Sequence, residues 1–482
     1  MSMTKDQVDI EDVSFILGEV RRIAKMSLAE EKKHISENRN SSDFLYVLRD
    51  EDEKGEYVCG REASRRLYKL GERHLDRQRE LRENTDPVRF NEVLASLLVR
   101  RFLTESREVN KREMQAMLSA AVKRLKAEQE SLTHYIPCVI FEVFPEEGHV
   151  AQKLKQAKYE QFDIGPVKFL RTAEFLRKHK RAIKGDLQET IKRELREKRE
   201  DFQESGDHIR FMLNSLTRFF RNYRWVAVVT IPSCNKKISR LRAETAVQGA
   251  LDILKLSFGP TQTDSMRLAE SHVRPADIAQ LTRPSIGPFS LMVSRRVAED
   301  TGITEVAFRQ ISESKDFYLE AASSALNACV DPQKEIHLSR RFLDGLTWYG
   351  QGVTETMPSA KIVKYVAAWE RLTITKKEEN GLTDKVTRRI AILSHLKAKG
   401  DLTNSLKEVK RIYDWRSKLM HGSCSPFNKE LPALSSLAGN ITATALNRSL
   451  EIFLRLAGRT KNAKEADLEA EYERLESLIV HE

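Results

Sequence analysis

Apolar residues recur at three- and four-residue spacing along most of this chain, which predicts amphipathic helices. Residues 1–132 show this spacing among many charged side chains, and residues 38–43 are expected to form a loop. The same spacing returns at about residue 333 and continues through five segments to a charged tail. Because the connections between these later segments are short, we expect sequential helices to be antiparallel neighbours in a bundle.

The pattern changes in the middle of the chain, where short runs rich in β-branched and aromatic residues predict strands. These runs lie at 134–144, 224–232 and 289–298, and the second is followed by a helix that Gly259 and Pro260 should end. The alternation predicts a middle α/β module, although the strand order cannot be derived from it. We therefore expect a mainly α chain in four parts: a helical N-terminal region (1–132), an α/β module (133–332), a helical bundle (333–460) and a helical tail (461–482).

Composition predicts a globular protein without a membrane segment. The chain has 482 residues, of which 40% are hydrophobic, so two or three domains with buried cores are expected. Its five cysteines form no CxxC pair, which argues against a zinc site and against a disulfide framework. No apolar run reaches the roughly 18 residues that span a bilayer, and the acidic N-terminus does not resemble a signal peptide. A reduced, cytoplasmic protein is the simplest expectation.

The charge balance is compatible with a nucleic-acid partner. The net charge is +11, and lysine and arginine attract phosphates without sequence preference. The predicted helix at 171–199 has eleven basic and five acidic residues, and its Lys178, Lys180 and Arg181 are candidate RNA-binding residues. A solvated charged helix with i,i+4 pairs is an equally good interpretation of this stretch.

One segment of the C-terminal region combines an arginine and a histidine in an unusual way. In the helix predicted from Leu402 to Met420, Leu406, Val409, Tyr413, Arg416 and Met420 follow one apolar stripe. The guanidinium of Arg416 must therefore meet an anion, a partner subunit or a water-filled groove, or extend past apolar surface into solvent. His421 follows, and Gly422 offers the left-handed conformation that ends helices. A histidine at this end is either a partner of the helix dipole or an acid or base near neutral pH.

The spacing of arginine and histidine is not specific by itself. It occurs again from Arg267 to His272 and from Arg388 or Arg389 to His395, where we interpret it as chance. The sequence context distinguishes the pair Arg416–His421 from the other two. The region 333–457 contains, one after another, the segments "RFLDGLTWYGQGV", "IVKYVAAWERLTI", "DKVTRRIAILS" and "IYDWRSKLMHGS". In this order they resemble the four helices of the Apea-like branch of the HEPN superfamily, helical domains of prokaryotic defence proteins and toxins.

The resemblance implies a HEPN-like antiparallel helical bundle and a metal-independent endoribonuclease without a cofactor. It implies catalytic roles for Arg416 and His421 in a cleft between two subunits, so a homodimer or a higher even oligomer is expected. Glu370, Tyr413 and Ser417 are supporting candidates, and Ser417 stands where asparagine is commonest in the wider superfamily. RNA cleavage needs a base for the 2′-hydroxyl, an acid for the 5′-oxygen and positive charge at the phosphate, which fits histidine and arginine.

Three functions stay open at this stage. The first is an RNase effector of a prokaryotic defence or toxin system, in which residues 1–332 sense a trigger or bind a partner protein. The second is a non-catalytic RNA-binding or dimerisation scaffold. The third is an enzyme whose chemistry lies in the middle module, but no triad, acidic metal cluster or glycine-rich phosphate loop is visible there.

Overall fold

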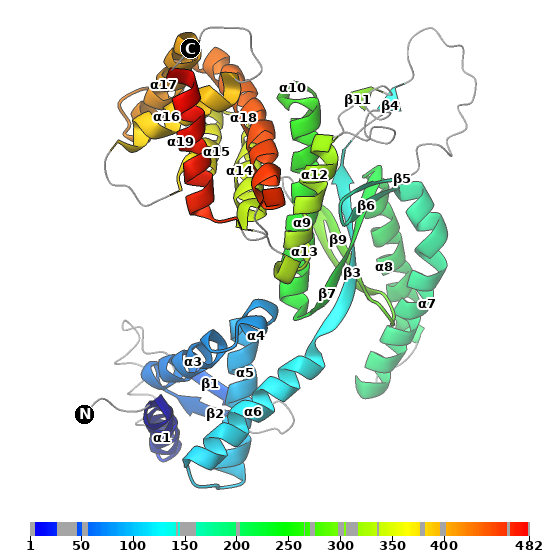
Figure 1. Cartoon of the computed structure of the whole chain (residues 1–482). Helices are drawn as coiled ribbons and strands as arrows, with labels where there is room; N and C mark the ends of the chain where they lie inside the picture. Colours follow the sequence, from blue (N-terminus) through cyan, green and yellow to red (C-terminus); the bar gives the residue numbers. More distant parts are fainter. Residues whose placement is uncertain are drawn as a thin grey trace. The chain divides into compact units, whose positions relative to one another are not determined.

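The computed structural model of the chain is mainly helical, with a sheet in its middle part, as the sequence predicts (Figure 1). The loop expected at 38–43 lies outside the residues that the structure describes. The described residues are 5–26, 46–50, 56–140, 143–144, 161–198, 203–264, 266–269, 275–296, 303–304, 317–334, 337–375, 381–395, 402–459 and 463–480.

The chain divides into two compact units. Met1–Ser131 and Pro232–Arg240 form the first unit, and Leu132–Ile231 with Leu241–Glu482 form the second. The longer segment of the first unit ends at Ser131, next to the boundary expected at residue 132. The boundary expected at residue 332 lies inside the second unit, which holds both the sheet and the C-terminal helices.

The first unit is a small helical assembly with a hairpin that the pattern did not predict. Its helices are α1 (Lys5–Ala24), α3 (Arg61–Asp76), α4 (Arg79–Asn84), α5 (Pro87–Leu98), the π-helix η1 (Val99–Thr104) and α6 (Lys111–Glu128). The hairpin pairs β1 (Tyr46–Arg49) with β2 (Glu56–Cys59) in antiparallel register. Each strand has only four residues, too few for a period-two pattern to be recognised.

Apolar side chains of these helices form one core, in which Leu70, Phe90 and Met117 are almost fully buried. Charges at its edge join α1 to α3: the Arg73 guanidinium donates to Asp9 Oδ1 at 2.8 Å and to Asp12 Oδ2 at 2.7 Å. Asp9 and Asp12 are both buried, so this arginine neutralises carboxylates that would otherwise be costly to desolvate.

The second unit contains a seven-stranded sheet with the order β10-β9-β3-β7-β6-β5, and β8 also pairs with β3. The strands predicted at 224–232 and 289–298 are confirmed as β7 and β10. The one predicted at 134–144 is confirmed as β3 up to Val139, whereas residues 143–144 form the separate strand β4. The hairpin β5–β6 and the strand β9 are additions that the pattern did not reveal. The strands are β3 (Glu130–Val139), β5 (Gln161–Ile164), β6 (Val167–Arg171), β7 (Trp225–Cys234), β8 (Arg267–Leu268), β9 (Pro275–Pro284) and β10 (Ser290–Arg296). A separate parallel pair joins β4 (Val143–Phe144) to β11 (Ile303–Thr304).

Helices cover both faces of this sheet. α7 (Thr172–Lys198) and α8 (Gln203–Arg221) place apolar side chains such as Phe175 and Phe220 against Tyr135, Val226 and Leu281 of the strands. Figure 1 shows α9 (Lys236–Phe258) on the opposite side of the sheet. Three successive residues of β7, Trp225, Val226 and Ala227, are buried, which fits a strand covered on both faces, whereas Thr230 further along is exposed.

The helices predicted after residue 333 are all present. They are α14 (His337–Thr354), α15 (Pro358–Thr373), α16 (Leu382–His395), α17 (Leu402–Met420), α18 (Leu431–Arg459) and the tail helix α19 (Glu465–Val480), preceded by the short α10 (Pro260–Thr263), α12 (Phe317–Ala325), α13 (Asn327–Val330) and η3 (Pro332–Lys334). α15 and α18 pack on each other and on α14, while α17 packs on α15 and α16. Close contact between α9 and α14 joins these helices to the sheet: Tyr349 Oη donates to the Lys255 carbonyl at 3.4 Å.

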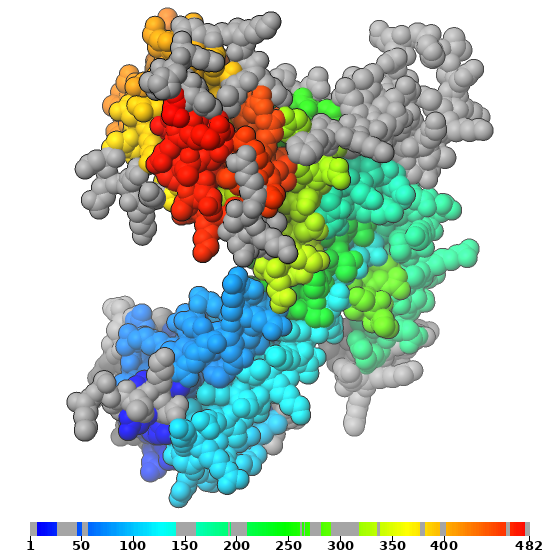
Figure 2. Space-filling view, in the orientation of Figure 1, coloured from blue at the N-terminus to red at the C-terminus, as the bar shows by residue number. Residues whose placement is uncertain are grey.

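The tail helix α19 lies on the surface of the C-terminal helices, where Figure 2 shows it in red. Buried ion pairs hold it there. Arg389, only 1% exposed, donates two hydrogen bonds to the carboxylate of Glu469 at 2.7 and 3.0 Å and a third to Glu476 at 3.1 Å. Lys385 reaches the same Glu469 at 2.8 Å. Arg341, equally buried, is bonded to Glu465.

Candidate active site

α15 and α17 carry the candidate catalytic residues and pack against each other. Glu370 lies in the last turn of α15, and the buried face of α17 consists of Val409, Ile412 and Tyr413. The predicted apolar stripe is therefore correct in the middle of α17 but wrong at its end, because Met420 is 58% exposed. In the last turn Leu419 is half-buried, whereas Lys418 and Met420 are exposed.

Glu370 joins the two candidate residues of α17. Its Oε1 accepts a hydrogen bond from Tyr413 Oη at 2.7 Å, and its Oε2 accepts one from Arg416 Nη2 at 3.2 Å. The side chains of Arg416 and Glu370 are 28% and 22% exposed. Of the alternatives that the sequence left open for Arg416, the structure shows an anion, Glu370, and the guanidinium is neither sealed in the core nor fully solvated.

This contact leaves hydrogen-bonding capacity on the arginine. Arg416 Nε is buried without a hydrogen-bond partner among the residues that the structure describes. Glu370 holds the guanidinium by one Nη2 bond, so the group is oriented but not saturated. Such a guanidinium can still donate to an oxyanion that enters from the solvent side.

Tyr413 acts as a donor in this arrangement. Burial raises the pKa of Tyr413, and its hydrogen bond to the Glu370 carboxylate raises it further, to about 12. The phenol is therefore protonated at neutral pH. It can fix the orientation of Glu370, and through it Arg416, but it cannot accept a proton from a substrate.

The end of α17 confirms the role predicted for Gly422. Its φ of +68° is left-handed, its N–H donates to the Leu419 carbonyl at 3.3 Å, and Ser423 N–H donates to the Lys418 carbonyl at 2.9 Å. This pair of bonds is the Schellman arrangement, in which glycine is favoured because it has no Cβ. His421 is the residue at which the helix closes, and it is exposed.

Replacing Gly422 with alanine should lower the free energy of unfolding by about 1 kcal/mol, because an L-residue is strained in the left-handed region. A Cβ at this position would meet no atom within 4 Å, so the backbone alone carries the effect. Gly458→Ala is the matched control, since its Cβ also meets nothing but its φ is not left-handed; it should be neutral or slightly stabilising. Urea unfolding followed by tryptophan fluorescence measures both, and equal effects would contradict the assignment.

The structure does not bring all the candidates into contact. Glu370, Tyr413 and Arg416 are bonded to one another, whereas no hydrogen bond or ion pair in the described part of the chain links the His421 side chain to them. Ser417 contributes its backbone: its carbonyl accepts from His421 N–H at 3.0 Å. Within one chain, the arginine and the histidine are therefore two separate groups at one end of α17.

The candidate RNA-binding residues Lys178, Lys180 and Arg181 are exposed on α7, as the sequence predicted. Arg177 beside them is bound to Glu174, with N–O distances of 2.6 to 3.0 Å. No ion pair is found for Lys178, Lys180 or Arg181 among the described residues. Their charges are thus available to a solvent-side anion.

The other two arginine–histidine pairs of similar spacing have structural roles in the residues that the structure describes. Arg389 belongs to the buried pairs with α19, and His395 is the last residue of α16. Arg267 lies in β8, while His272 is outside the described residues. The partners Glu469 and Glu476 could not be identified from the sequence, because they lie 80 and 87 residues beyond Arg389.

Three further observations bear on the chemistry. All five cysteines are free thiols, and Cys424 is the one that is not buried. No group of three or more His, Cys, Asp or Glu side chains suited to a metal ion is found among the described residues. Within the same residues, no helix has both the length and the apolar character needed to cross a membrane.

Comparisons with known proteins identify no relative of this chain. No protein-family model matches the chain, and neither a search of curated proteins nor one of solved structures finds a match. The candidate site therefore has to be judged on its own geometry and on the sequence resemblance.

Proposed function

We propose that the chain is a metal-independent endoribonuclease of the HEPN type. The observation that carries this proposal is the pairing of a partly exposed Arg416, oriented by Glu370, with an exposed His421 at the end of the same helix. Arginine supplies a planar fork of donors for phosphate oxygens, and histidine supplies an acid or base near neutral pH.

In the proposed reaction a base removes the proton of the 2′-hydroxyl, and the 2′-oxygen attacks the adjacent phosphorus. The P–O5′ bond breaks, and an acid protonates the departing 5′-oxygen. The products carry a 2′,3′-cyclic phosphate and a 5′-hydroxyl. Arg416 stabilises the negative charge that gathers on the phosphate oxygens in the transition state, and His421 performs proton transfer.

The reaction needs proton transfer on two sides of the phosphorus, which favours a site shared by two copies of the chain. A two-fold dimer would bring two His421 side chains and two Arg416 side chains into one cleft. Met420 and Phe427, on either side of His421 in the chain, are 58% and 83% exposed. Burying such large apolar side chains against a second copy would stabilise this dimer.

The proposal extends to the role of the protein in the cell. The nuclease acts on RNA in the cytoplasm as an effector of a prokaryotic defence or toxin system. The first unit and the sheet of the second unit, within residues 1–332, receive the trigger or bind a partner protein. The resemblance of the C-terminal helices supports this assignment, together with the net charge of +11.

RNA cleavage with a chelator present tests the proposed chemistry. The full-length chain should cleave single-stranded RNA in EDTA and leave 2′,3′-cyclic phosphate ends, which phosphatase cannot remove without prior opening of the ring. Products with 3′-hydroxyl ends would contradict the mechanism, as would activity that EDTA abolishes and magnesium restores.

A non-catalytic scaffold is the second candidate. Two observations favour it. Glu370 already accepts a hydrogen bond from one nitrogen of the Arg416 guanidinium, and among the described residues no hydrogen bond or ion pair joins Arg416 to the His421 side chain. In this case the exposed end of α17 would bind RNA or a second copy without cleaving. A chain that dimerises and binds RNA but shows no cleavage, with or without metal, would favour it.

Charge reversal on α7 tests whether the exposed basic face contributes to RNA affinity. The triple variant Lys178→Glu, Lys180→Glu, Arg181→Glu should weaken binding of single-stranded RNA at least about tenfold and lower the salt slope by about 0.7 per lost phosphate contact. Reversal of the exposed Lys123 and Lys126 on α6 is the control. Unchanged affinity and slope in the triple variant would mean that this face is only solvated surface.

A further inference from the structure

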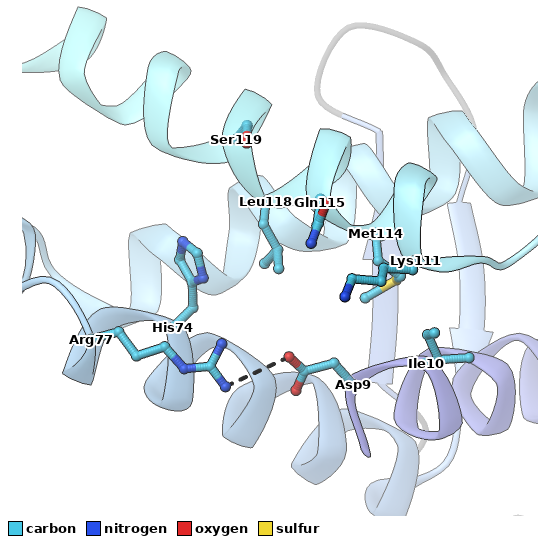
Figure 3. Close-up of a pocket in the computed structure, with 9 residues that line it drawn as sticks. All are labelled: Asp9, Ile10, His74, Arg77, Lys111, Met114, Gln115, Leu118 and Ser119. Atoms are coloured by element: carbon cyan, nitrogen blue, oxygen red, sulfur yellow. Dashed lines mark ion pairs between the residues drawn. The ribbon is translucent and has the colours of Figure 1, made fainter. Parts of the chain in front are cut away.

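A second candidate site lies in the first unit, away from the residues discussed so far. A surface cavity of about 300 Å³ opens between α1, α3 and α6. Figure 3 shows its lining, in which Lys111 and Gln115 point from α6 towards Asp9 of α1. The volume is at the lower end of the roughly 300–1,000 Å³ of small-molecule sites. The lining residues are Asp9, Ile10, His74, Arg77, Lys111, Met114, Gln115, Leu118 and Ser119.

The polar part of this lining is positively charged. Arg77 and Lys111 contribute two cations, whereas the one carboxylate, Asp9, is already bound by Arg73 at 2.8 and 3.1 Å. Arg77 Nη2 lies 3.9 Å from Asp9 Oδ2, too far for a hydrogen bond, so it can turn to a closer acceptor. Lys111 is also the first residue of α6, whose helix dipole adds positive potential at this end.

His74 adds a buried donor without an acceptor. Burial lowers the pKa of His74, and the nearby Arg77 charge lowers it further, so the ring is neutral at neutral pH. Its Nε2 lies 3.1 Å from the Gln78 side-chain nitrogen, a donor in this orientation, and therefore accepts. The proton then resides on Nδ1, which is buried and has no hydrogen-bond partner among the described residues. A buried N–H of this kind is costly unless a ligand oxygen meets it.

The lining also has an apolar part, which fits an organic body rather than a bare ion. Ile10, Met114 and Leu118 form this part, and the His74 ring lies parallel to Phe90 at a centroid distance of 5.9 Å, which holds its plane fixed. Two cations and a neutral N–H beside an apolar wall match a phosphate group attached to a small, partly apolar molecule.

We propose that this cavity binds a small organic phosphate monoester of about mononucleotide size. Arg77 and Lys111 hold the phosphate charge, His74 Nδ1–H donates to a phosphate oxygen, and the body lies against Met114 and Leu118. The site is independent of the proposed nuclease chemistry, because none of its residues belongs to the candidate active site.

Calorimetric titration of the full-length chain with adenosine 5′-monophosphate (AMP) tests the proposal. Arg77→Gln, Lys111→Gln and His74→Phe should each weaken AMP binding about tenfold or more, equivalent to about 1.4 kcal/mol. His74→Phe keeps a flat ring beside Phe90 and removes the Nδ1 donor, together with the Nε2 acceptor of the Gln78 hydrogen bond. Lys126→Gln, an exposed cation on the same helix, should bind as the unchanged chain does. Arg416→Ala should also bind normally, which separates this cavity from the candidate nuclease site.

Comparison probes decide the ligand class. Inorganic phosphate tests the charge without the body, adenosine tests the body without the charge, and benzoate tests a carboxylate in place of the phosphate. All three should bind at least about tenfold more weakly than AMP. Equal binding of any of them would overturn the phosphate monoester, and AMP binding that is absent, or unchanged in the three cavity variants, would overturn the site. Unchanged melting temperatures of the variants exclude unfolding as the cause.

Discussion

The variant His421→Ala should lose RNA cleavage by at least about a hundredfold and remain folded, because acid–base groups contribute about 10²–10⁴ to the rate. The side chain is exposed at the close of α17, where the Schellman bonds use backbone atoms only, so its removal should cost little stability. Rates of cleavage of a labelled RNA, together with urea unfolding, measure the two effects separately.

His395→Ala is the matched control for this variant. His395 also ends a helix of the same bundle and follows an arginine at similar spacing, but that arginine is buried in ion pairs with α19. Its replacement should leave cleavage unchanged. Full activity in His421→Ala would remove the nuclease proposal, and equal loss in both variants would indicate a general effect on the bundle.

Arg416→Ala should reduce cleavage to a similar extent with a modest cost in stability. The structure shows this arginine paired with Glu370 and partly exposed, so its removal relieves no unpaired, desolvated charge. Removing it leaves Glu370 with Tyr413 as its partner, so a cost of about 1 kcal/mol is expected. Glu370→Gln should keep the stability and lower activity less, since it loosens Arg416 without removing it.

Mixing the two inactive chains tests the shared cleft. If one subunit supplies Arg416 and the other His421, heterodimers of Arg416→Ala and His421→Ala regain part of the activity in one of two clefts. If each cleft needs both residues from both subunits, the mixture stays inactive. Cleavage by a chain that sediments as a monomer under assay conditions would exclude the shared cleft.

The largest loss of stability is expected for Glu469→Ala, by about 3–5 kcal/mol, the usual cost of removing one partner from a buried ion pair. Arg389 and Glu469 are 1% and 5% exposed, so the variant would remove the carboxylate that accepts two of the buried guanidinium's hydrogen bonds and leave Glu476 as its carboxylate partner. Glu473→Ala, an exposed position of the same helix, should change stability by no more than about 0.5 kcal/mol. Tryptophan fluorescence during urea unfolding is a suitable probe, because Trp225, Trp348, Trp369 and Trp415 all belong to the second unit.

The pH dependence of stability provides an independent measure of the same pair. Burial acts to raise the pKa of Glu469, but hydrogen bonds from Arg389, Lys385 and Thr375 outweigh it and hold the pKa at about 2. The depressed pKa means that this stabilisation is complete above the unfolded value of about 4.3 and is lost as the pH falls towards 2. The loss is on the order of 3 kcal/mol. Glu469→Ala should therefore show a shallower acid dependence than the unchanged chain, and parallel curves would contradict the assignment.

Several features could be predicted from the sequence because they depend on neighbouring residues. The three- and four-residue spacing of apolar positions predicted the six helices from α14 to α19, and β-branched runs predicted β3, β7 and β10. The glycine at 422 predicted the end of α17, since only the local backbone conformation decides a helix terminus of this kind. The exposed charges of α7 followed from the same helical period.

Tertiary structure alone decided what each polar group meets. Arg389 and Arg416 are both arginines on the bundle helices, yet one is buried against α19 and the other is partly exposed beside Glu370. Glu370 lies 46 residues before Arg416, and no local pattern selects a partner at that separation. The same holds for the cavity around His74, whose lining comes from three helices. Periodicity determines which face of an element is apolar, whereas the pairing of charges depends on which elements pack together.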